Sequence, residues 1–294
     1  MADFKPEDAN TFVEQQLDNY IEDLQAYFKA DAISFFGPIL RKIDDFIRDA
    51  IEKINPKHEK LAVILQTTGG SIEVAERIAN LFRYHYKHVD FIIPGHAMSA
   101  GTVLVMSGDD IYMDYYSVLG PIDPQIEKSG TSGLIPALGY LTYFDRLIEK
   151  SRQGSLTTAE LAYLIQRFDA AELYQFEQAI DLSKDLLRNW LVRYKFKNWT
   201  ETEGRKIPVT QQMKEQAAKK IADLLSQADE WHSHSRGISL AVLNDKVKLR
   251  IKDYGSDAEL NNRICAYYKL LSDYVMRRGH QIIVHTKGRY IQLF

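Results

Sequence analysis

Two glycine-marked turns, each between a short apolar run and a helical segment, constrain the fold of this chain most. The first, Gln66-Thr-Thr-Gly-Gly-Ser71, follows the apolar run Leu61–Leu65, and the second, Gly95-His-Ala-Met-Ser-Ala-Gly101, lies about thirty residues later. Apolar runs that alternate with helical segments predict βαβ units in a parallel sheet. Right-handed crossovers then bring both turns to the carboxyl ends of neighbouring strands.

The rest of the chain extends this α/β pattern with helices at both ends. Apolar groups at helical spacing in residues 11–54 predict two helices, and long helical patterns dominate beyond residue 130. A last apolar stretch, residues 281–285, predicts a late strand. We divide the chain into an N-terminal helical arm (1–57), a core (58–155) and a helical C-terminal extension (156–294). The predicted strands are 61–66, 89–94 and 110–114, and the predicted helices are 71–86, 99–108, 134–151, 157–196, 210–227 and 256–278.

Composition excludes several classes of protein. The chain has 294 residues, a formal net charge of -3 and 26% charged residues, so it offers no electrostatic case for nucleic acid or an anionic membrane. Its single cysteine, Cys265, excludes an internal disulfide framework and fits a reducing compartment. No window approaches eighteen uncharged apolar residues, and the N-terminus lacks the pattern of a secretion signal. We therefore expect a cytoplasmic protein without a membrane span, metal or organic cofactor.

Ser99 is the leading candidate for a catalytic residue. It lies where a strand is predicted to turn into a helix, and Ala100 and Gly101 are too small to cover its hydroxyl. The same position also suits a helix N-cap, so both interpretations stay open from the residues alone. If Ser99 is a nucleophile, the amides of Gly70 and Ala100 are the predicted oxyanion donors, and Gly69 gives the oxyanion-hole turn its conformational freedom.

Three segments carry a resemblance to a known family. The segments are Thr68-Gly-Gly-Ser-Ile72, Ala97-Met-Ser-Ala-Gly-Thr102 and Val118-Leu-Gly-Pro-Ile-Asp-Pro-Gln125. They resemble the ClpP-class serine proteases, most of all the serine dehydrogenase proteinase branch related to SppA signal peptide peptidases. The resemblance covers residues 58–130 and, more loosely, 231–238. It implies a ClpP/crotonase-like α/β fold in which residues 58–155 form the protease core, and a chain that forms homo-oligomers.

The resemblance also implies a general base for the serine, because a hydroxyl is a weak nucleophile until its proton is taken. The branch uses the order Ser, Asp, His, which falls here on Ser99, Asp123 and His234. His232 is a close rival of His234, and Asp123 before a proline also suits a turn. SppA-type relatives use a lysine base instead, for which Lys128 and Lys150 are the candidates.

We therefore predict a serine endopeptidase that cleaves peptides or unfolded protein segments through an acyl-enzyme. Three alternatives stay open: a Ser-Lys dyad peptidase of SppA type, a crotonase-like acyl-CoA enzyme, and a non-catalytic scaffold that keeps the fold. A crotonase-like enzyme would use the same kind of backbone amides to stabilise an enolate and would need no serine.

Overall fold

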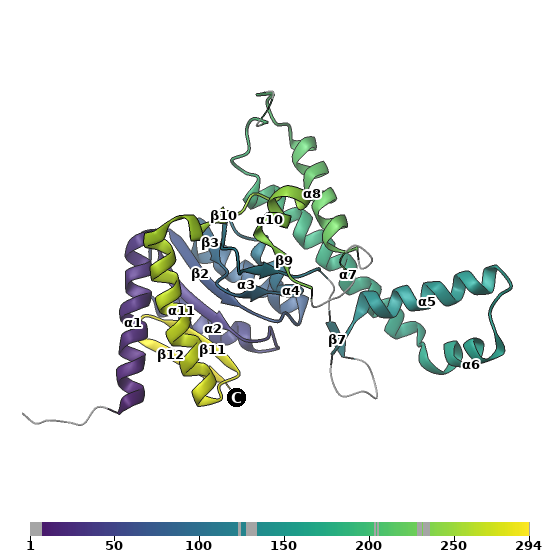
Figure 1. Ribbon diagram of the computed structural model, residues 1–294, viewed down its shortest axis with the longest axis horizontal. Helices are drawn as coiled ribbons and strands as arrows, with labels where there is room; N and C mark the ends of the chain where they lie inside the picture. Colours follow the sequence, from purple (N-terminus) through teal and green to yellow (C-terminus); the bar gives the residue numbers. More distant parts are fainter. Residues whose placement is uncertain are drawn as a thin grey trace, which may run out of the picture.

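The fold is organised around one seven-stranded sheet, seen in the computed structural model of the chain (Figure 1). The structure describes residues 8–293 except 123–124, 128–133, 203, 205, 228–230 and 232–235. The strand order is β10-β5-β3-β2-β1-β11-β12, in which β1, β2, β3, β5 and β10 run parallel, while β11 and β12 are antiparallel additions. These strands are β1 (Asp31–Phe36), β2 (Lys60–Gln66), β3 (His88–Ile92), β5 (Asp110–Met113), β10 (Lys252–Asp253), β11 (Ile282–Thr286) and β12 (Arg289–Leu293).

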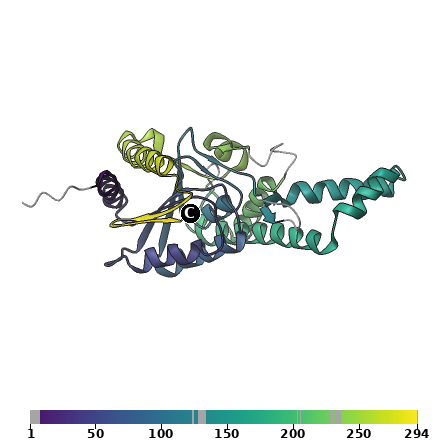
Figure 2. The same cartoon turned by 90° about the horizontal axis from the view of Figure 1, so that it is seen from below.

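Helices cover both faces of this sheet, so the body of the molecule has three layers (Figure 2). One face carries α1 and α11, which pack on each other, and the other carries α2, α3 and α4, with α7 against the last two. Helices α5 and α6 project away from the sheet as an arm (Figure 1). The helices are α1 (Ala9–Phe28), α2 (Ile43–Glu52), α3 (Ile72–His85), α4 (Ala100–Val105), α5 (Ala137–Arg152), α6 (Thr158–Arg167), α7 (Ala170–Trp190), α8 (Gln211–Leu225), α10 (Leu240–Val242) and α11 (Ala258–Arg278), with π-helical turns η1 (Leu191–Lys195) and η2 (Leu243–Val247) and the 3-10 turn η3 (Tyr254–Ser256).

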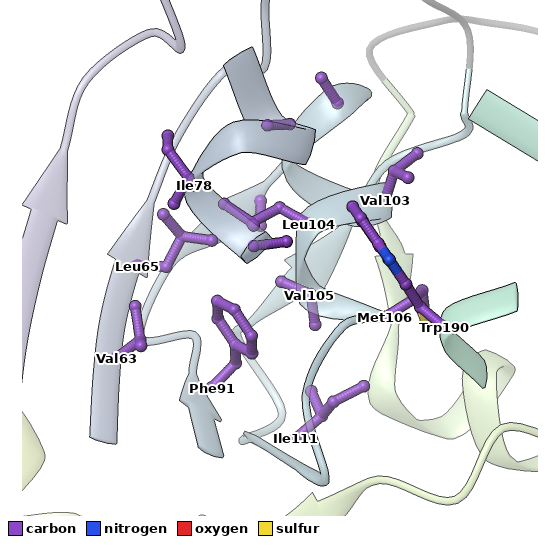
Figure 3. Packing of buried hydrophobic residues seen from close by; sticks show 14 of the residues in the cluster. Val63, Leu65, Ile78, Phe91, Val103, Leu104, Val105, Met106, Ile111 and Trp190 are labelled. Carbon is purple, nitrogen blue, oxygen red and sulfur yellow. The ribbon is translucent and has the colours of Figure 1, made fainter. Parts of the chain in front are cut away.

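Side chains of the central strands alternate between two cores, as expected for strands buried on both faces. In β2, Val63 and Leu65 belong to the core beneath α2, α3 and α4, whereas Ala62 and Ile64 belong to the core beneath α1 and α11. Figure 3 shows the first core, where α4 inserts Leu104 among residues of α3 and the strands. Because α4 is anchored by its apolar residues, the turn that precedes it is held in a fixed place.

A second, three-stranded sheet lies beside the carboxyl ends of the parallel strands. It has the order β4-β6-β9, with β4 (His96–Ala97) parallel to β6 (Val118–Leu119) and β9 (Ile238–Ser239) antiparallel to β6. A hairpin of β7 (Gln125–Glu127) and β8 (Leu134–Pro136) leads into the arm. The small sheet therefore joins chain segments more than a hundred residues apart.

The mostly parallel α/β architecture is confirmed, and several details of the sequence prediction are wrong. Residues 134–136, predicted to begin a helix, form β8, and the short strands β6, β7, β9, β10 and β12 were not predicted. The N-terminal segment is not only helical, because β1 lies between its two helices and pairs with β2 along its whole length. All six residues of β1 are buried, so it lacks the polar alternation that marks a half-buried strand. The single helix predicted at 157–196 is broken at Phe168, which is extended, and Asp169 caps the new helix. The late strand predicted at 281–285 is confirmed as β11.

Candidate active site

The two glycine-marked turns meet at the carboxyl edge of the parallel strands. The N–H of Thr67 donates to the carbonyl of His96 at 3.0 Å, and the N–H of Met98 donates to the carbonyl of Thr67 at 3.0 Å. A Cβ added to Gly69 would lie 2.6 Å from the Met98 oxygen and 2.8 Å from the Cβ of Ser99. The turns are therefore in direct contact, and only a glycine fits at position 69 against the serine.

Ser99 has a strained backbone at the start of α4. Its φ of 51° and ψ of -119° are unusual for a residue with a side chain, and it is buried, with 1% exposed. Although Ser99 occupies the N-cap position, its side chain makes no capping hydrogen bond. A backbone of this kind costs about 1–3 kcal/mol and persists only where its surroundings enforce it, most often at functional sites. The N-cap interpretation therefore leaves the strained backbone of Ser99 unexplained.

The backbone amides near Ser99 differ in their availability. The Gly69 N–H donates to Thr67 Oγ1 at 3.0 Å, so it is already engaged. Within the described residues, no hydrogen bond uses the N–H of Gly70 or of Ala100. Gly70 has a φ of 142°, and the carbonyl oxygen of Ile39 lies within 3.0 Å of where a Cβ would stand. Among the described residues, these two amides next to the serine are therefore without a hydrogen-bond acceptor.

The three-stranded sheet draws together the segments of the predicted triad. Ser99 follows β4 by two residues, Asp123 follows β6 by four, and His234 precedes β9 by four. These strands are hydrogen-bonded neighbours. Asp123 and His234 themselves lie outside the described residues, as do His232 and Lys128. The nearby described histidine, His96, is half-buried, and burial lowers the pKa of its imidazole.

The other base candidate that the structure describes is Lys150, which lies near the end of α5 in the arm. Its ammonium is 2.6 Å from the carboxylate of Glu160, and the side chain is 43% exposed. A lysine that acts as a base is normally buried and away from carboxylates. Lys150 is exposed and pairs with a carboxylate, so its surroundings do not fit this role.

The amino edge of the same strands holds a network of buried charges that the sequence analysis missed. His88, Asp90 and Asp110 form a group whose ligand atoms lie within 4.8 Å of one another. Two lysines already neutralise the carboxylates, because Lys60 is 2.7 Å from Asp90 and Lys252 is 2.7 Å from Asp110. A divalent cation would have to displace these ammonium groups, so we assign no metal here. The partners come from separate strands, and no local sequence pattern reveals them.

A cavity of about 320 Å³ opens at this amino edge, on the side of α1 and α11. Both Lys60 and Lys252 line it, together with aromatic residues and carboxylates. Its position puts it at the opposite end of the strands from Ser99. The cavity is therefore separate from the candidate active site.

Part of this chain, including both turns, is similar to known serine proteinases. Residues 21–141 match the model of the ClpP-like SDH-type serine proteinase family. The matched region contains both turns, β4 and β6, and ends in α5. The resemblance to ClpP-class serine proteases is thus confirmed for the part of the chain that carries Ser99.

Two uncharacterized proteins of Methanocaldococcus jannaschii are similar to part of this chain. One is 31% identical over 140 residues, which cover 46% of this chain and 45% of the relative. The other is 32% identical over 116 residues, which cover 37% of this chain and 40% of the relative. The chain therefore spans less than half the length of the curated relatives it matches.

Two solved structures are similar to part of this one. A mutant of the 1510-N membrane-bound stomatin-specific protease is 20% identical, with a TM-score of 0.30 over 41% of this chain and 62% of that one. The ClpP protease catalytic domain from Plasmodium falciparum is 22% identical, with a TM-score of 0.27 over 33% and 59%. In the part of this chain that the structure describes, no helix has both the length and the apolar character needed to cross a bilayer.

Proposed function

We propose that this protein is a serine endopeptidase that cleaves peptides or unfolded protein segments through an acyl-enzyme. Ser99 attacks the peptide carbonyl, and the amides of Gly70 and Ala100 bind the resulting oxyanion, with Gly69 shaping the turn. His234 takes the serine proton and returns it to the leaving amine, while Asp123 orients the imidazole. The reaction calls on no metal or cofactor.

The observation that carries this proposal is the strained Ser99 beside the Gly69-Gly70 turn. A serine with φ of 51° at a strand-to-helix junction, next to two unused amides, matches the geometry that acyl transfer requires. The match of residues 21–141 to a serine proteinase family supports the same chemistry. Because Ser99 is buried, a substrate has to displace the residues that cover it.

The direct test replaces Ser99 and follows both hydrolysis and covalent labelling. Wild type should cleave a fluorogenic peptide and react with a fluorophosphonate at Ser99, and Ser99→Ala should do neither. Ser107→Ala is the matched control, since Ser107 is a buried serine at the other end of α4 that bonds the Leu104 carbonyl at 2.7 Å. Labelling at another serine, or undiminished hydrolysis by Ser99→Ala, would contradict the assignment of Ser99 as the nucleophile.

The identity of the base is tested by pH and by paired variants. With a histidine base, turnover should rise with pH through a midpoint near 6.5, because only neutral imidazole accepts the serine proton. His234→Ala should lose nearly all turnover, His232→Ala little, and Asp123→Asn should be impaired. Lys150→Ala should behave as wild type, because its ammonium is engaged by Glu160. Full activity in the His232/His234 double variant, with loss on changing Lys128, would favour the dyad.

We also propose that the chain forms a homo-oligomer. Large apolar side chains are exposed to solvent on the arm and at the start of α7. Ile165 of α6 is 70% exposed, and Tyr174 of α7 is 62% exposed. Apolar surface of this kind favours association. Light scattering gives the mass directly, and a species of 33.9 kDa at micromolar concentration would contradict the proposal.

A further inference from the structure

Thr67 makes contacts with both turns of the candidate active site. It is the first residue after β2, it is 1% exposed, and its backbone N–H and carbonyl bond His96 and Met98 as described above. Its hydroxyl oxygen accepts the Gly69 N–H at 3.0 Å. One residue therefore bonds the oxyanion turn through its side chain and the serine turn through its backbone.

The methyl group of Thr67 adds a packing contact to these bonds. Its Cγ2 lies within 3.0 Å of where a Cβ on Gly101 would stand. Gly101 belongs to the first turn of α4, two residues after Ser99, and its own φ is not in the left-handed region. The absence of a side chain at position 101 is thus explained by Thr67 and not by backbone conformation.

The hydroxyl also decides which amide is left to act. Thr67 engages the Gly69 N–H and so removes it from the free donors of this turn. Among the described residues, the N–H of Thr68, which is exposed, and the N–H of Gly70, which is buried, have no acceptor, so Gly70 supplies the buried donor. A valine in its place would keep one methyl against Gly101 but put a second methyl where the Gly69 N–H now finds an oxygen. The Gly69 N–H would lose its acceptor, and the turn would have to move.

We infer that Thr67 is a positioning residue that sets the oxyanion donor of Gly70 relative to the Ser99 nucleophile. Its hydroxyl fixes the conformation of the Gly-Gly turn, and its methyl and backbone fix the distance between that turn and α4. The catalytic part of this inference rests on the proposed function. The contacts are independent of it, so they can be tested without any substrate.

The contact between Thr67 and Gly101 is tested by a double-mutant cycle on stability. Gly101→Ala alone should lower the Tm by about 5 °C, because the new methyl collides with Cγ2 of Thr67. In the Thr67→Ser background, which lacks that methyl, the same substitution should lower the Tm by less than half as much. Equal losses in both backgrounds would show that Thr67 does not set this spacing.

The role of the hydroxyl is tested by comparing Thr67→Val with Thr67→Ser. We expect Thr67→Val to lower kcat at least about tenfold with little change in KM, since a donor misplaced in the transition state costs rate more than binding. Thr67→Ser should keep most of the rate. Ser107→Ala loses a buried hydroxyl bond just after α4. It should lower the Tm about as much as Thr67→Val does but leave kcat unchanged. The inference would be overturned if Thr67→Val kept the kcat of wild type, or if Thr67→Val and Thr67→Ser lowered kcat equally.

Amide hydrogen exchange separates failure of this inference from failure of the proposed function. The Gly69 N–H should exchange faster in Thr67→Val than in wild type, and its exchange rate in Thr67→Ser should equal that of wild type. Both expectations hold whether or not the protein hydrolyses peptides. If wild type shows no hydrolysis and no labelling of Ser99 but the exchange pattern holds, the peptidase proposal fails and the positioning of the turn stands. Unaltered Gly69 exchange in Thr67→Val would refute the hydroxyl contact itself.

Discussion

Buried polar groups have different partners at the two edges of the parallel strands. At the amino edge, the described residues pair each buried carboxylate with cations: Asp109, for example, meets both Arg83 and Lys197. At the carboxyl edge, the described ion pairs do not reach the buried carboxylate of Asp114, which accepts from the N–H groups of Tyr116 and Ser117 instead. Among the described residues of this edge, the N–H groups of Gly70 and Ala100 have no acceptor, and Ser99 has a strained backbone. Satisfied charges stabilise a fold, whereas strain and unused donors are what a reaction can exploit. The comparison therefore assigns structure to one edge and chemistry to the other.

The strongest test of this division removes a buried carboxylate at the amino edge. Asp109→Ala should lower the free energy of unfolding by about 3–5 kcal/mol, because it leaves the Arg83 guanidinium buried without its partner. Turnover per folded molecule should not change. Urea unfolding measures the first quantity and active-site titration the second. The control is Asp185→Ala, whose ion pair with Arg188 is largely exposed and should cost only about 0–1 kcal/mol.

The next test changes the carboxyl edge. Gly70→Ala should reduce kcat about 10²- to 10³-fold, because the new Cβ meets the Ile39 carbonyl and pushes the Gly70 N–H out of place. Measured kcat and KM decide whether the loss lies in the chemical step. Gly154→Ala replaces another glycine with positive φ, 65° against 142° at Gly70, that has open space around it. It therefore adds backbone strain without a clash, and its kcat should be that of wild type. If both variants lose rate alike, backbone strain alone explains the effect.

A smaller effect measures the strain stored at Ser99. Ser99→Gly should be more stable than Ser99→Ala by about 1 kcal/mol, since glycine adopts a φ of 51° without steric cost but loses more chain entropy on folding. Both variants lack the hydroxyl and should be inactive. Denaturant unfolding compares them directly. Equal stability of the two would mean that the nucleophile turn is not strained.

The smallest effect expected is the response of stability to acid. Burial alone would raise the pKa of Asp109, but bonds from Lys197 and the Val89 N–H and the charge of Arg83 outweigh it and hold that pKa below 3.8. The carboxylate therefore stabilises the fold fully above about pH 4, and this contribution is lost as the pH falls through the lowered folded pKa. Thermal unfolding between pH 6 and 2 should show this slope. Asp109→Asn should flatten it, and an unchanged slope would place the acid sensitivity elsewhere.

The sequence predicted most of the parallel core and the turn that carries Ser99, because both have local signals. Apolar runs, Ser71 as the cap of α3 and the Gly-Gly pair are each visible within a few neighbouring residues. Strand β1 was missed because two buried polar residues, Asp31 and Ser34, interrupt the kind of apolar run that reveals β2. The ion network and the role of Thr67 were missed for another reason: they depend on partners from other strands, which only the fold brings within reach.

The long-range pairing of β1 with β11 sets an order for folding during synthesis. Ser34 pairs with Ile64 on one side, thirty residues away, but with His285 on the other, near the end of the chain. The units from β1 to β5 can form locally while the chain is still being made, whereas β9, β10, β11 and α11 join last. The predicted base, His234, precedes β9, so the Ser99 turn can form before the segment of that base has been made. If the two residues act as proposed, Ser99 stays unactivated in a growing chain until β9 has emerged from the ribosome.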